Sequence, residues 1–506
     1  MTANSNQGLG TRVIRGTIGG LSITLLSNLF FFIAQLIIPR SLSRPEYAQF
    51  TVSLSFVVLM SLVADLGLLH MHTRQFAECF EDIAQGRADR RGSLFGSVLT
   101  LRLALSFFVS MLVVIVAPLI YGHDMVANME IFLISLFVSS RILIVRAAGE
   151  SLLRGRGLYY VASFFVLIDS ATFVLILVAL AQTGTSLRNV VWAYSISGLP
   201  GFILMSLYIF RWLRAERIRL SIDYRIILNM LRMALPLSFA TAFFVIFNEG
   251  DKLLLDKLST AAEVSNFGAV IRISTGLAVF PIVLGAILSP ELTRLLKRKD
   301  YVRARNLTGL ATRVLLIAGG GIGLTVSLLS KTTTTILLGQ KYVTAAPALE
   351  WVGLLMIPFF VASFIAELMI AAGLFRTNML YMAIVMCMAI GGDLVLIPRL
   401  GASGAAISRL MGVTIGIIFL LIAQWKANFI DMPRLSRSFL NLGIAILLSL
   451  FLGVTLRGHM ADYYVAASII IFYLAAIHFL KLMQWKDVLY LVNSVFPKNK
   501  NTPESI

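Results

Sequence analysis

The sequence contains fourteen long, continuous apolar segments, which is more apolar surface than a soluble domain can bury. Hydrophobic residues make up 58% of the 506 residues and charged residues only 13%, against about 25% charged in soluble domains. A transmembrane helix needs roughly 20 apolar residues, and the segments do not alternate in polarity as barrel strands do. We therefore expect an all-α polytopic membrane protein of about 14 transmembrane helices. The segments run over residues 18–38, 48–69, 94–120, 129–145, 161–180, 190–210, 233–255, 264–289, 311–329, 346–370, 379–397, 402–424, 439–456 and 463–480.

The basic residues are concentrated on alternate connections between these segments. Lys and Arg number 43 against 25 Asp and Glu, and the net charge of +18 at first suggests nucleic-acid binding. However, 31 of the 43 lie on one set of connections, which includes 70–93, 141–160 and 211–232, and only eight lie on the other set. This asymmetry follows the positive-inside rule and predicts that both termini are cytoplasmic. The charge therefore indicates anionic lipid of an inner membrane as the partner, and not nucleic acid.

The chain resembles itself when it is shifted by 217 residues. Matches at this offset fall at equivalent ends of segments, for example Glu46 with Glu263 and Glu150 with Glu367. The shift covers six segments, so the two halves have the same orientation, as in parallel-repeat transporters. We expect two six-helix lobes plus two extra helices, with the transported group near the midplane between the lobes. The predicted parts are the N-lobe with spans 1–6 (residues 1–220), the C-lobe with spans 7–12 (221–430), spans 13–14 (431–480), and a cytoplasmic interfacial helix with a tail (481–506).

Ten of the ionisable residues inside the predicted spans are candidate functional residues, because charge there is costly. Asp251 and Arg272 lie at matching depth on adjacent antiparallel helices, on the order of 12–15 Å from the outer ends. Either they form a structural pair, or Arg272 faces the cavity and receives an anion such as a phosphate, for which guanidinium is well suited. Both hold if the ligand competes with Asp251 for Arg272. The ten residues are Asp65, Arg102, Asp169, Glu249, Asp251, Lys252, Arg272, Glu367, Asp393 and Arg409.

The seventh predicted span has the densest charge. Glu249 and Lys252 are spaced i,i+3, and Lys252 and Asp256 are spaced i,i+4, so Lys252 has local acidic neighbours. Lys252 and Arg409 are further candidates for binding an anion in the cavity. An acid inside a span either couples transport to a proton or sodium gradient, or is neutral or paired within its helix. The coupling candidates are Glu249, Asp251, Glu367 and Asp393.

The connections indicate transport and not catalysis. The predicted outer loops are all too short to hold the domain that a membrane polymerase or glycosyltransferase usually carries. The five histidines lack metal-ligand spacing, so we expect no catalytic residue, no metal and no cofactor. Asp65 and Arg102 are expected to lie near span ends and to reach toward the interface. On the inner side, a basic mouth that favours an anionic headgroup is expected from Arg12, Arg15, Arg154 and Arg156.

Several motifs, taken in order and spacing over most of the chain, resemble those of bacterial polysaccharide-biosynthesis flippases. In the segment that closes the first helix, Ala48 stands where that family usually has glycine. Ala64-Asp65-Leu66-Gly67-Leu68 resembles the Asp-Leu-Gly turn of the family. The remaining motifs follow its seventh-to-eighth and eleventh-to-twelfth helix patterns. The matching stretches are residues 38–50, 64–68, 236–237, 251–255, 267–269, 272, 290–292 and 397–406.

The chain is thus identified as similar to the oligosaccharide flippase (Wzx-type) branch of the multidrug/oligosaccharidyl-lipid/polysaccharide (MOP) exporter superfamily. The resemblance implies an inner-membrane protein that moves undecaprenyl-pyrophosphate-linked oligosaccharide to the periplasmic leaflet by alternating access. The product would serve O-antigen (lipopolysaccharide), capsule or exopolysaccharide synthesis, with polysaccharide polymerase or export machinery as partners. Related lipid II flippases have an eighth-helix arginine at a position similar to Arg272, where it serves the pyrophosphate. Arg12 and Arg15 lie only at the mouth of the first helix, which argues against lipid II as the substrate.

Two other function classes remain as alternatives. A cation-coupled multidrug antiporter of the same superfamily should have net acid in its cavity and usually has twelve spans. A membrane glycosyltransferase or polymerase should have a large outer loop. A drug-efflux assay distinguishes the first from a flippase, and product formation from a lipid-linked donor distinguishes the second.

Overall fold

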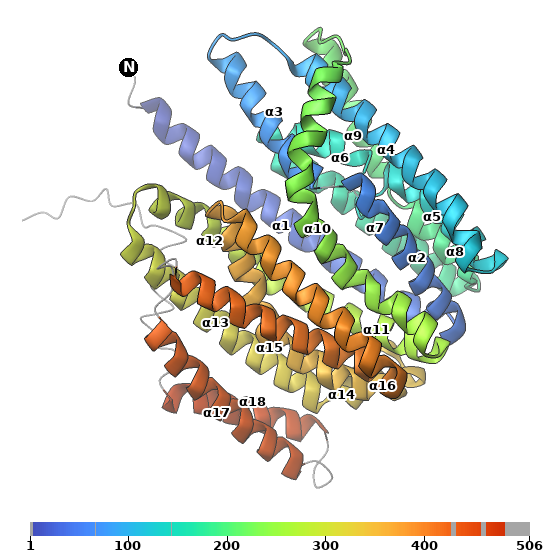
Figure 1. Cartoon of the computed structure of the whole chain (residues 1–506), viewed down its shortest axis with the longest axis vertical. Helices are drawn as coiled ribbons and strands as arrows, with labels where there is room; N and C mark the ends of the chain where they lie inside the picture. The colour runs from blue at the N-terminus through green and yellow to red at the C-terminus, as the bar shows by residue number, and fades with distance from the viewer. Residues whose placement is uncertain (1–3, 66, 143, 427–431, 457–461, 481–506) are drawn as a thin grey trace, which may run out of the picture. The chain divides into compact units, whose positions relative to one another are not determined.

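The computed structural model describes residues 4–65, 67–142, 144–426, 432–456 and 462–480, and the regular elements of these residues are all helices (Figure 1). Each of the fourteen predicted segments lies wholly or mostly on helix, so the all-α prediction is confirmed. The chain divides into two compact units, Met1–Gly268 and Ala269–Ile506. The predicted interfacial helix and tail, 481–506, lie outside the described residues.

The first unit contains α1 (Asn4–Ser41), α2 (Arg44–Asp65), α3 (Leu68–Ala84), α4 (Arg91–Ile120), α5 (His123–Val138), α6 (Arg146–Gly155), α7 (Tyr159–Thr183), α8 (Leu187–Ile196), α9 (Leu199–Ala215), α10 (Tyr224–Leu258) and the start of α11 (Ala261–Leu277). The second contains the rest of α11, α12 (Val279–Lys297), α13 (Tyr301–Leu328), α14 (Ser330–Leu338), the 3-10 helix η1 (Gln340–Ala345), α15 (Ala346–Ala371), α16 (Phe375–Lys426), α17 (Met432–Leu456) and α18 (Asp462–Phe479). The boundary between the units lies after residue 220, the predicted end of the N-lobe, because α10 packs on α2, α3 and α4. The lobe boundaries at 220 and 430 stay predictions.

Many of the helices are long and apolar enough to cross a membrane. Within the described residues nine pass that test, or ten when the two halves of α10, which meet at 63°, count as one span. The expected number of fourteen is not confirmed. The difference has structural reasons: α5 has only 16 residues, the apolar parts of α17 and α18 are short, and α16 takes up two predicted spans. The protein is a multi-pass membrane protein.

Helix α16 is a hairpin of two antiparallel helices. Its backbone reverses at Gly401, whose φ of 55° and ψ of −128° suit glycine. Small residues at four-residue spacing, Gly404, Ser408, Gly412 and Gly416, then let the arms approach closely. A Cβ on Gly404 would lie 2.4 Å from the carbonyl oxygen of Leu396. The hairpin confirms that 379–397 and 402–424 are separate helical segments.

The starts of α2 and α11 carry the same N-terminal motif 217 residues apart. Before α2, the backbone N and the Oγ of Ser43 donate to Glu46 Oε2 at 2.9 and 2.6 Å. Before α11, the backbone N of Glu263 donates to Thr260 Oγ1 at 3.4 Å. Both fit the capping-box pattern, in which a Ser or Thr N-cap is followed three residues later by Glu. This equivalence supports the repeat expected from the sequence.

The same two helix starts also touch each other within the first unit. Arg44 Nη2 donates to Asn266 Oδ1 at 2.7 Å. A Cβ on Gly268 would lie 3.0 Å from the side chain of Thr51, and these two positions are again 217 residues apart. A two-fold axis along the membrane normal between the repeats stays a prediction.

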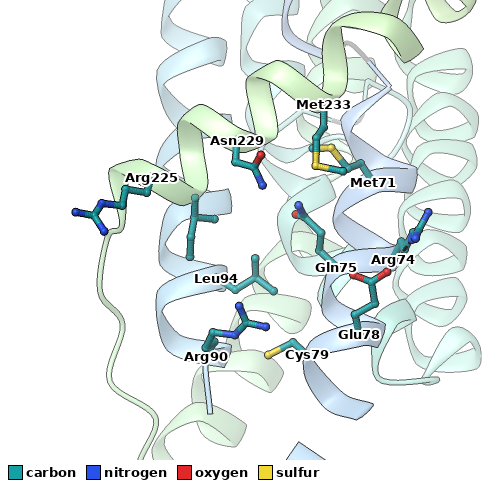
Figure 2. Close-up of a pocket in the computed structure, with 11 residues that line it drawn as sticks. Met71, Arg74, Gln75, Glu78, Cys79, Arg90, Leu94, Arg225, Asn229 and Met233 are labelled. Atoms are coloured by element: carbon teal, nitrogen blue, oxygen red, sulfur yellow. Dashed lines mark hydrogen bonds and ion pairs between the residues drawn. The ribbon is translucent and has the colours of Figure 1, made fainter. Parts of the chain in front are cut away.

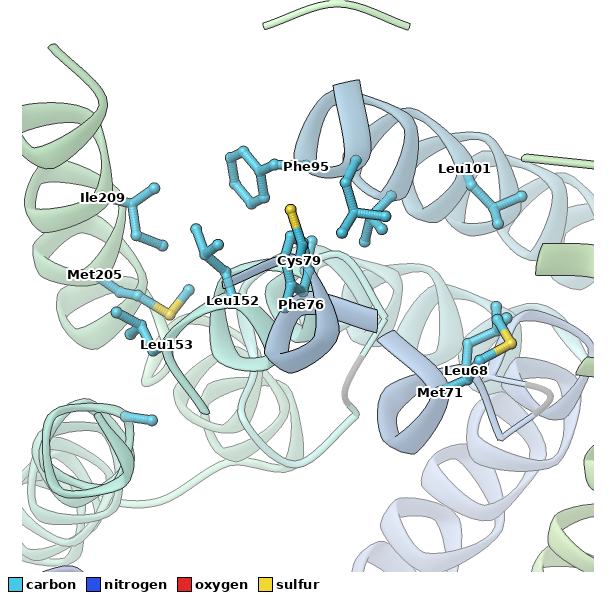
Figure 3. Packing of buried hydrophobic residues seen from close by; sticks show 14 of the residues in the cluster. Leu68, Met71, Phe76, Cys79, Phe95, Leu101, Leu152, Leu153, Met205 and Ile209 are labelled. Atoms are coloured by element: carbon cyan, nitrogen blue, oxygen red, sulfur yellow. The ribbon is translucent and has the colours of Figure 1, made fainter. Parts of the chain in front are cut away.

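Helix α3 falls in 70–93, which the sequence predicts to be a connection, and it is instead a helix with one buried face. Phe76 is fully buried and Cys79 nearly so, against side chains from α4, α6 and α9 such as Phe95, Leu152 and Met205 (Figure 3). The turn before α3 uses Gly67, whose φ of 68° is left-handed. Hydropathy alone missed this helix because its other face is polar.

In the second unit the two last helices pack on each other and on α13. Tyr473 on α18 donates its hydroxyl to the carbonyl oxygen of Ile317 at 2.9 Å. A Cβ on Gly320 would lie 2.3 Å from that hydroxyl oxygen, so the glycines of α13 make room for the ring. Close packing is therefore a role of this glycine-rich stretch.

Candidate functional site

In the first unit, the helix of the fourth predicted span (129–145) ends at Val138, and the sixth predicted span (190–210) is interrupted at residues 197–198. Helix α6 begins at Arg146, so one interruption lies between α5 and α6 and the other between α8 and α9. The two interruptions touch, because a Cβ on Gly198 would lie 2.7 Å from the oxygen of Val138 and 2.9 Å from the Cα of Ser139. Backbone that leaves the helix inside a membrane protein must find partners in protein or water. Interrupted helices of transporters commonly form binding sites for this reason.

Arg146 fills the space where the interruptions meet. Its side chain is fully buried, and Nη1 donates to the carbonyl oxygens of Val138 and Gly198, each at 3.3 Å. The same Nη1 lies 2.5 Å from Asp169 Oδ2 on α7, whose side chain is also fully buried. One guanidinium thus partners freed carbonyls of both interruptions and a carboxylate.

A second carboxylate continues this buried network. Glu150 on α6 accepts from Arg146 Nε through Oε1 at 3.1 Å and from Arg154 Nη2 through Oε2 at 2.9 Å. The side chain of Glu150 is almost fully buried, whereas that of Arg154 is partly exposed. Around Asp169 the packing is tight, since a Cβ on Gly201 would lie 2.1 Å from Asp169 Oδ1. Such a network holds α6, α7 and α9 in one arrangement.

Arg141 lies in the interruption itself and is held differently. Its guanidinium stacks on three aromatic rings, with centroid distances of 4.9 Å to Phe31, 4.4 Å to Phe173 and 5.1 Å to Tyr194. Nη1 donates to Ser197 Oγ at 2.9 Å. Nε and Nη2 are buried and have no hydrogen-bond partner in the described chain. No carboxylate there lies within ion-pair distance of Arg141.

On the sequence alone, Arg141 and Arg146 fall in the connection predicted for 141–160. In the structure Arg141 does lie between helices α5 and α6 and is half-buried among rings, whereas Arg146 begins α6 and has no exposed side-chain area. The signal that could have located them is spacing. Arg146, Glu150 and Arg154 recur every four residues, which places them on one helix face.

A pocket of about 520 Å³ opens between α3, the start of α4 and the first part of α10 (Figure 2). Most of its lining residues belong to connections predicted to face the cytoplasm, whereas Leu94 and Met233 begin predicted spans. Gln75 and Asn229 point into the pocket, whereas Arg225 points away from it. Arg74 pairs with Glu78 at 2.8 Å, and burial raises the pKa of the Cys79 thiol, so it stays protonated. The groups that this pocket presents to a ligand are therefore mainly amide and apolar side chains, and not arginines without an acidic partner.

The residues expected at the basic mouth have partners of their own. Arg154 pairs with Glu150, as above. Arg156 lies 3.6 Å from Glu216 Oε1 and stacks on the Trp212 ring, 4.7 Å from its centroid. Arg12 and Arg15 lie on the first part of α1. Whether these four arginines receive a headgroup stays a prediction.

Asp65 and Arg102 do not reach separately toward the interface. Arg102 Nη1 lies 3.3 Å from Asp65 Oδ1, and the Arg102 side chain is fully buried. The expectation that both side chains extend to the membrane surface is therefore wrong for Arg102. The pair joins α4 to the end of α2, which the linear sequence does not reveal.

The charges of the seventh predicted span lie on α10, where the expected local pair of Lys252 with Glu249 is present and Asp256 pairs instead with Lys257. Lys252 Nζ lies 2.5 Å from Glu249 Oε2, and both residues are at least partly buried. Asp256 lies 3.2 Å from Lys257 Nζ. Asp251 is 1% exposed and accepts through Oδ1 from the backbone N of Lys252 at 2.8 Å. Asp251 belongs to the first unit and Arg272 to the second, so their pairing stays a prediction.

The remaining candidates lie in the second unit. Arg272 on α11 is half-buried, and its Nε is buried without a hydrogen-bond partner among the described residues. Asp393 and Arg409 are buried on opposite arms of the α16 hairpin, next to the close contact of Gly392 with Ser408. Glu367 is exposed, near the end of α15. Ligand binding by Arg272 and Arg409, and ion coupling through Glu367 and Asp393, stay predictions.

The fold is shared with two groups of solved membrane proteins. The lipid II flippase MurJ, in an inward closed conformation, has a TM-score of 0.69 at 13% identity and covers 93% of this chain and 99% of its own. An inward-facing multidrug resistance MATE family transporter of the MOP superfamily has a TM-score of 0.65 at 15% identity and covers 81% and 98%. An outward-facing MATE structure has a TM-score of 0.59 at 15% identity and covers 82% and 95%.

A comparison with protein-family models covers less of the chain than the solved structures do, but it identifies a family. No curated protein matches the chain significantly. Residues 13–296 match the family described as polysaccharide biosynthesis protein, and this match covers more than half of the 506 residues. The resemblance noted in the sequence motifs is thereby confirmed at the level of the family, and the chain belongs to the polysaccharide biosynthesis protein family.

Proposed function

We propose that the protein is a flippase that moves an undecaprenyl-pyrophosphate-linked oligosaccharide from the cytoplasmic to the periplasmic leaflet of a bacterial inner membrane. The family match carries this proposal, because polysaccharide assembly needs lipid-linked sugars on the outer side of the membrane. The product would enter O-antigen, capsule or exopolysaccharide synthesis. Polymerase or export machinery would then take it up, and the proposed mechanism is alternating access between the two lobes.

The chemistry of the spans supports an anionic cargo. A pyrophosphate crossing the membrane needs donors that stay charged, and guanidinium remains protonated even where it is buried. Arg141 in the first unit and Arg272 in the second each have buried guanidinium nitrogens without a hydrogen-bond partner in the described parts of the chain. We assign Arg272 as the receptor of the pyrophosphate, with Arg409 and Lys252 as further cations.

The acids of the spans are the proposed coupling groups. Asp251 and Asp393 are nearly fully buried, so a change in their protonation would alter the local charge strongly. Glu249 already neutralises Lys252, and Glu367 is exposed. A proton or a sodium ion is the coupling ion that such carboxylates would take.

The experiment is complementation of a strain that lacks its own copy of the gene and therefore lacks surface polysaccharide. Wild type should restore the polymer, whereas Arg272→Ala should abolish it and Arg272→Lys should restore it only in part. Lysine keeps the charge but loses the two-pronged geometry. The matched control is Arg376→Ala, which removes an exposed arginine from α16 of the same unit. Normal polymer with Arg272→Ala at normal protein level contradicts the receptor role.

Multidrug antiport is the competing function, because MATE transporters share the fold. The larger share of this chain that MurJ covers, 93% against 81%, favours the flippase architecture over the shorter antiporter one. A drug-efflux assay in a sensitised strain separates the two. Resistance to cationic drugs without restoration of surface polysaccharide would replace the flippase by the antiporter.

A further inference from the structure

We propose that Arg141, in the interruption between α5 and α6, is a second anion-binding residue for the pyrophosphate of the cargo or for a sugar carboxylate. This inference rests on the proposed function and adds a receptor in the first unit to the one assigned in the second. The site consists of Arg141, the rings of Phe31 on α1, Phe173 on α7 and Tyr194 on α8, and the hydroxyl of Ser197, which follows α8. It is separate from the Figure 2 pocket, whose lining residues do not include Arg141.

The Arg141 guanidinium has a free edge, which is the edge formed by Nε and Nη2. Nη1 is used by Ser197, while Nε and Nη2 are buried and lack hydrogen-bond partners in the described residues. The N–H groups of these two nitrogens lie in the guanidinium plane and point outward from the same edge. Two parallel N–H groups on one edge match the two oxygens of a phosphate or a carboxylate.

The buried carboxylates near Arg141 pair with Arg146 and not with Arg141. The neighbouring Arg146 is fully buried and is already neutralised by Asp169 and Glu150 at 2.5 and 3.1 Å. Arg141 has no carboxylate within ion-pair distance in the part of the chain that the structure describes. Because an unpaired buried charge is costly, it persists where an anion is to be bound.

The aromatic cage gives the site rigidity and a cover. Stacking on Phe31, Phe173 and Tyr194 fixes the plane of the guanidinium and partly compensates its charge through cation–π attraction. Phe173 and Tyr194 are buried, whereas Phe31 on α1 is half-buried. Phe31 is therefore the least buried ring of this cage and the side from which an anion would approach Arg141.

The test is equilibrium binding of radiolabelled farnesyl pyrophosphate to the full-length protein in detergent, with farnesol as the uncharged control. Arg141→Gln and Arg141→Lys should each weaken binding of farnesyl pyrophosphate at least about tenfold, the usual loss for a charged hydrogen-bonded pair. Farnesol binding should not change. The matched control Arg188→Gln removes an exposed arginine from α8 of the same unit and should bind like wild type. Glucuronate as competitor shows whether a sugar carboxylate reaches the same edge.

The outcomes separate this inference from the proposed function. If Arg141→Gln is not recovered as a folded protein, Arg141→Lys decides, since it keeps the charge and the stacking. Wild-type affinity of the variants for farnesyl pyrophosphate overturns the role of Arg141 and leaves the flippase function standing. If wild type binds farnesyl pyrophosphate no better than farnesol, the proposed function itself is contradicted. A purely structural Arg141 would lower the melting temperature without changing the preference for pyrophosphate over farnesol.

Discussion

At the residue scale, the buried arginines of the first unit have two distinct environments. Arg146 is surrounded by carbonyls and carboxylates that use its donors, so its main effect is on the local structure. Arg141 is surrounded by rings that restrict it without using its free edge. Sequence alone shows that both are arginines near a span end. Their separation into a positioning residue and a proposed binding residue comes from contacts with α7, α8 and α9.

The Asp169–Arg146 pair should contribute strongly to stability because both side chains are fully buried. Removing one partner of a buried ion pair costs about 3–5 kcal/mol, since a charge is left without its counter-ion. We expect Asp169→Asn to melt well below wild type in detergent. Arg74→Ala breaks a pair whose side chains are 80% and 56% exposed, and should melt like wild type. Equal melting temperatures for Asp169→Asn and wild type would mean that the pair is not formed.

At the element scale, the sequence predicts where apolar helices lie but not where they break. The fourteen apolar segments lie wholly or mostly on helix because length and apolar content favour helices in a membrane, although fourteen separate spans are not confirmed. The interruptions near Val138 and Gly198 escaped the hydropathy pattern, because they depend on each other and on the guanidinium of Arg146 between them. Helix α3 escaped it because its polar face lowers its mean hydropathy. The candidate site was therefore predicted only in part.

The α16 hairpin offers a test of close helix packing with a neighbouring control. A Cβ on Gly404 would lie 2.4 Å from the oxygen of Leu396, whereas a Cβ on Gly391 would meet no atom within 4 Å. Gly404→Ala should force the arms apart and lower the melting temperature, since overpacking costs about 1–3 kcal/mol. Gly391→Ala should be neutral or slightly stabilising, because alanine favours helix. If both variants melt alike, the two arms are not packed as described.

At the scale of the whole molecule, the sequence predicts an internal repeat and the orientation of the chain in the membrane. Two capping boxes 217 residues apart agree with the duplication, and the charge asymmetry predicts the sidedness. The sequence predicts Arg272 at the same depth as Asp251, and this pairing stays a prediction because the two residues belong to different units.

The predicted sidedness is testable by cysteine labelling in a background where Cys79 and Cys387 are replaced by serine. Arg188→Cys lies on a connection predicted to face the periplasm and Arg376→Cys on one predicted to face the cytoplasm, and both positions are exposed. A membrane-impermeant maleimide added to spheroplasts should label Arg188→Cys at once. It should label Arg376→Cys only after permeabilisation. The opposite pattern would invert the topology and the proposed direction of transport.

Translocation by the purified protein in vesicles tests the account most directly. The full-length protein is reconstituted into liposomes that contain the undecaprenyl-pyrophosphate-linked oligosaccharide of its own strain, with a label on the sugar. A membrane-impermeant enzyme that removes the label is then added outside. We predict that the sugar of the inner leaflet becomes accessible with wild type, and that Arg141→Gln and Arg272→Ala are both slowed. Loss of label no faster than in protein-free vesicles would contradict the flippase function.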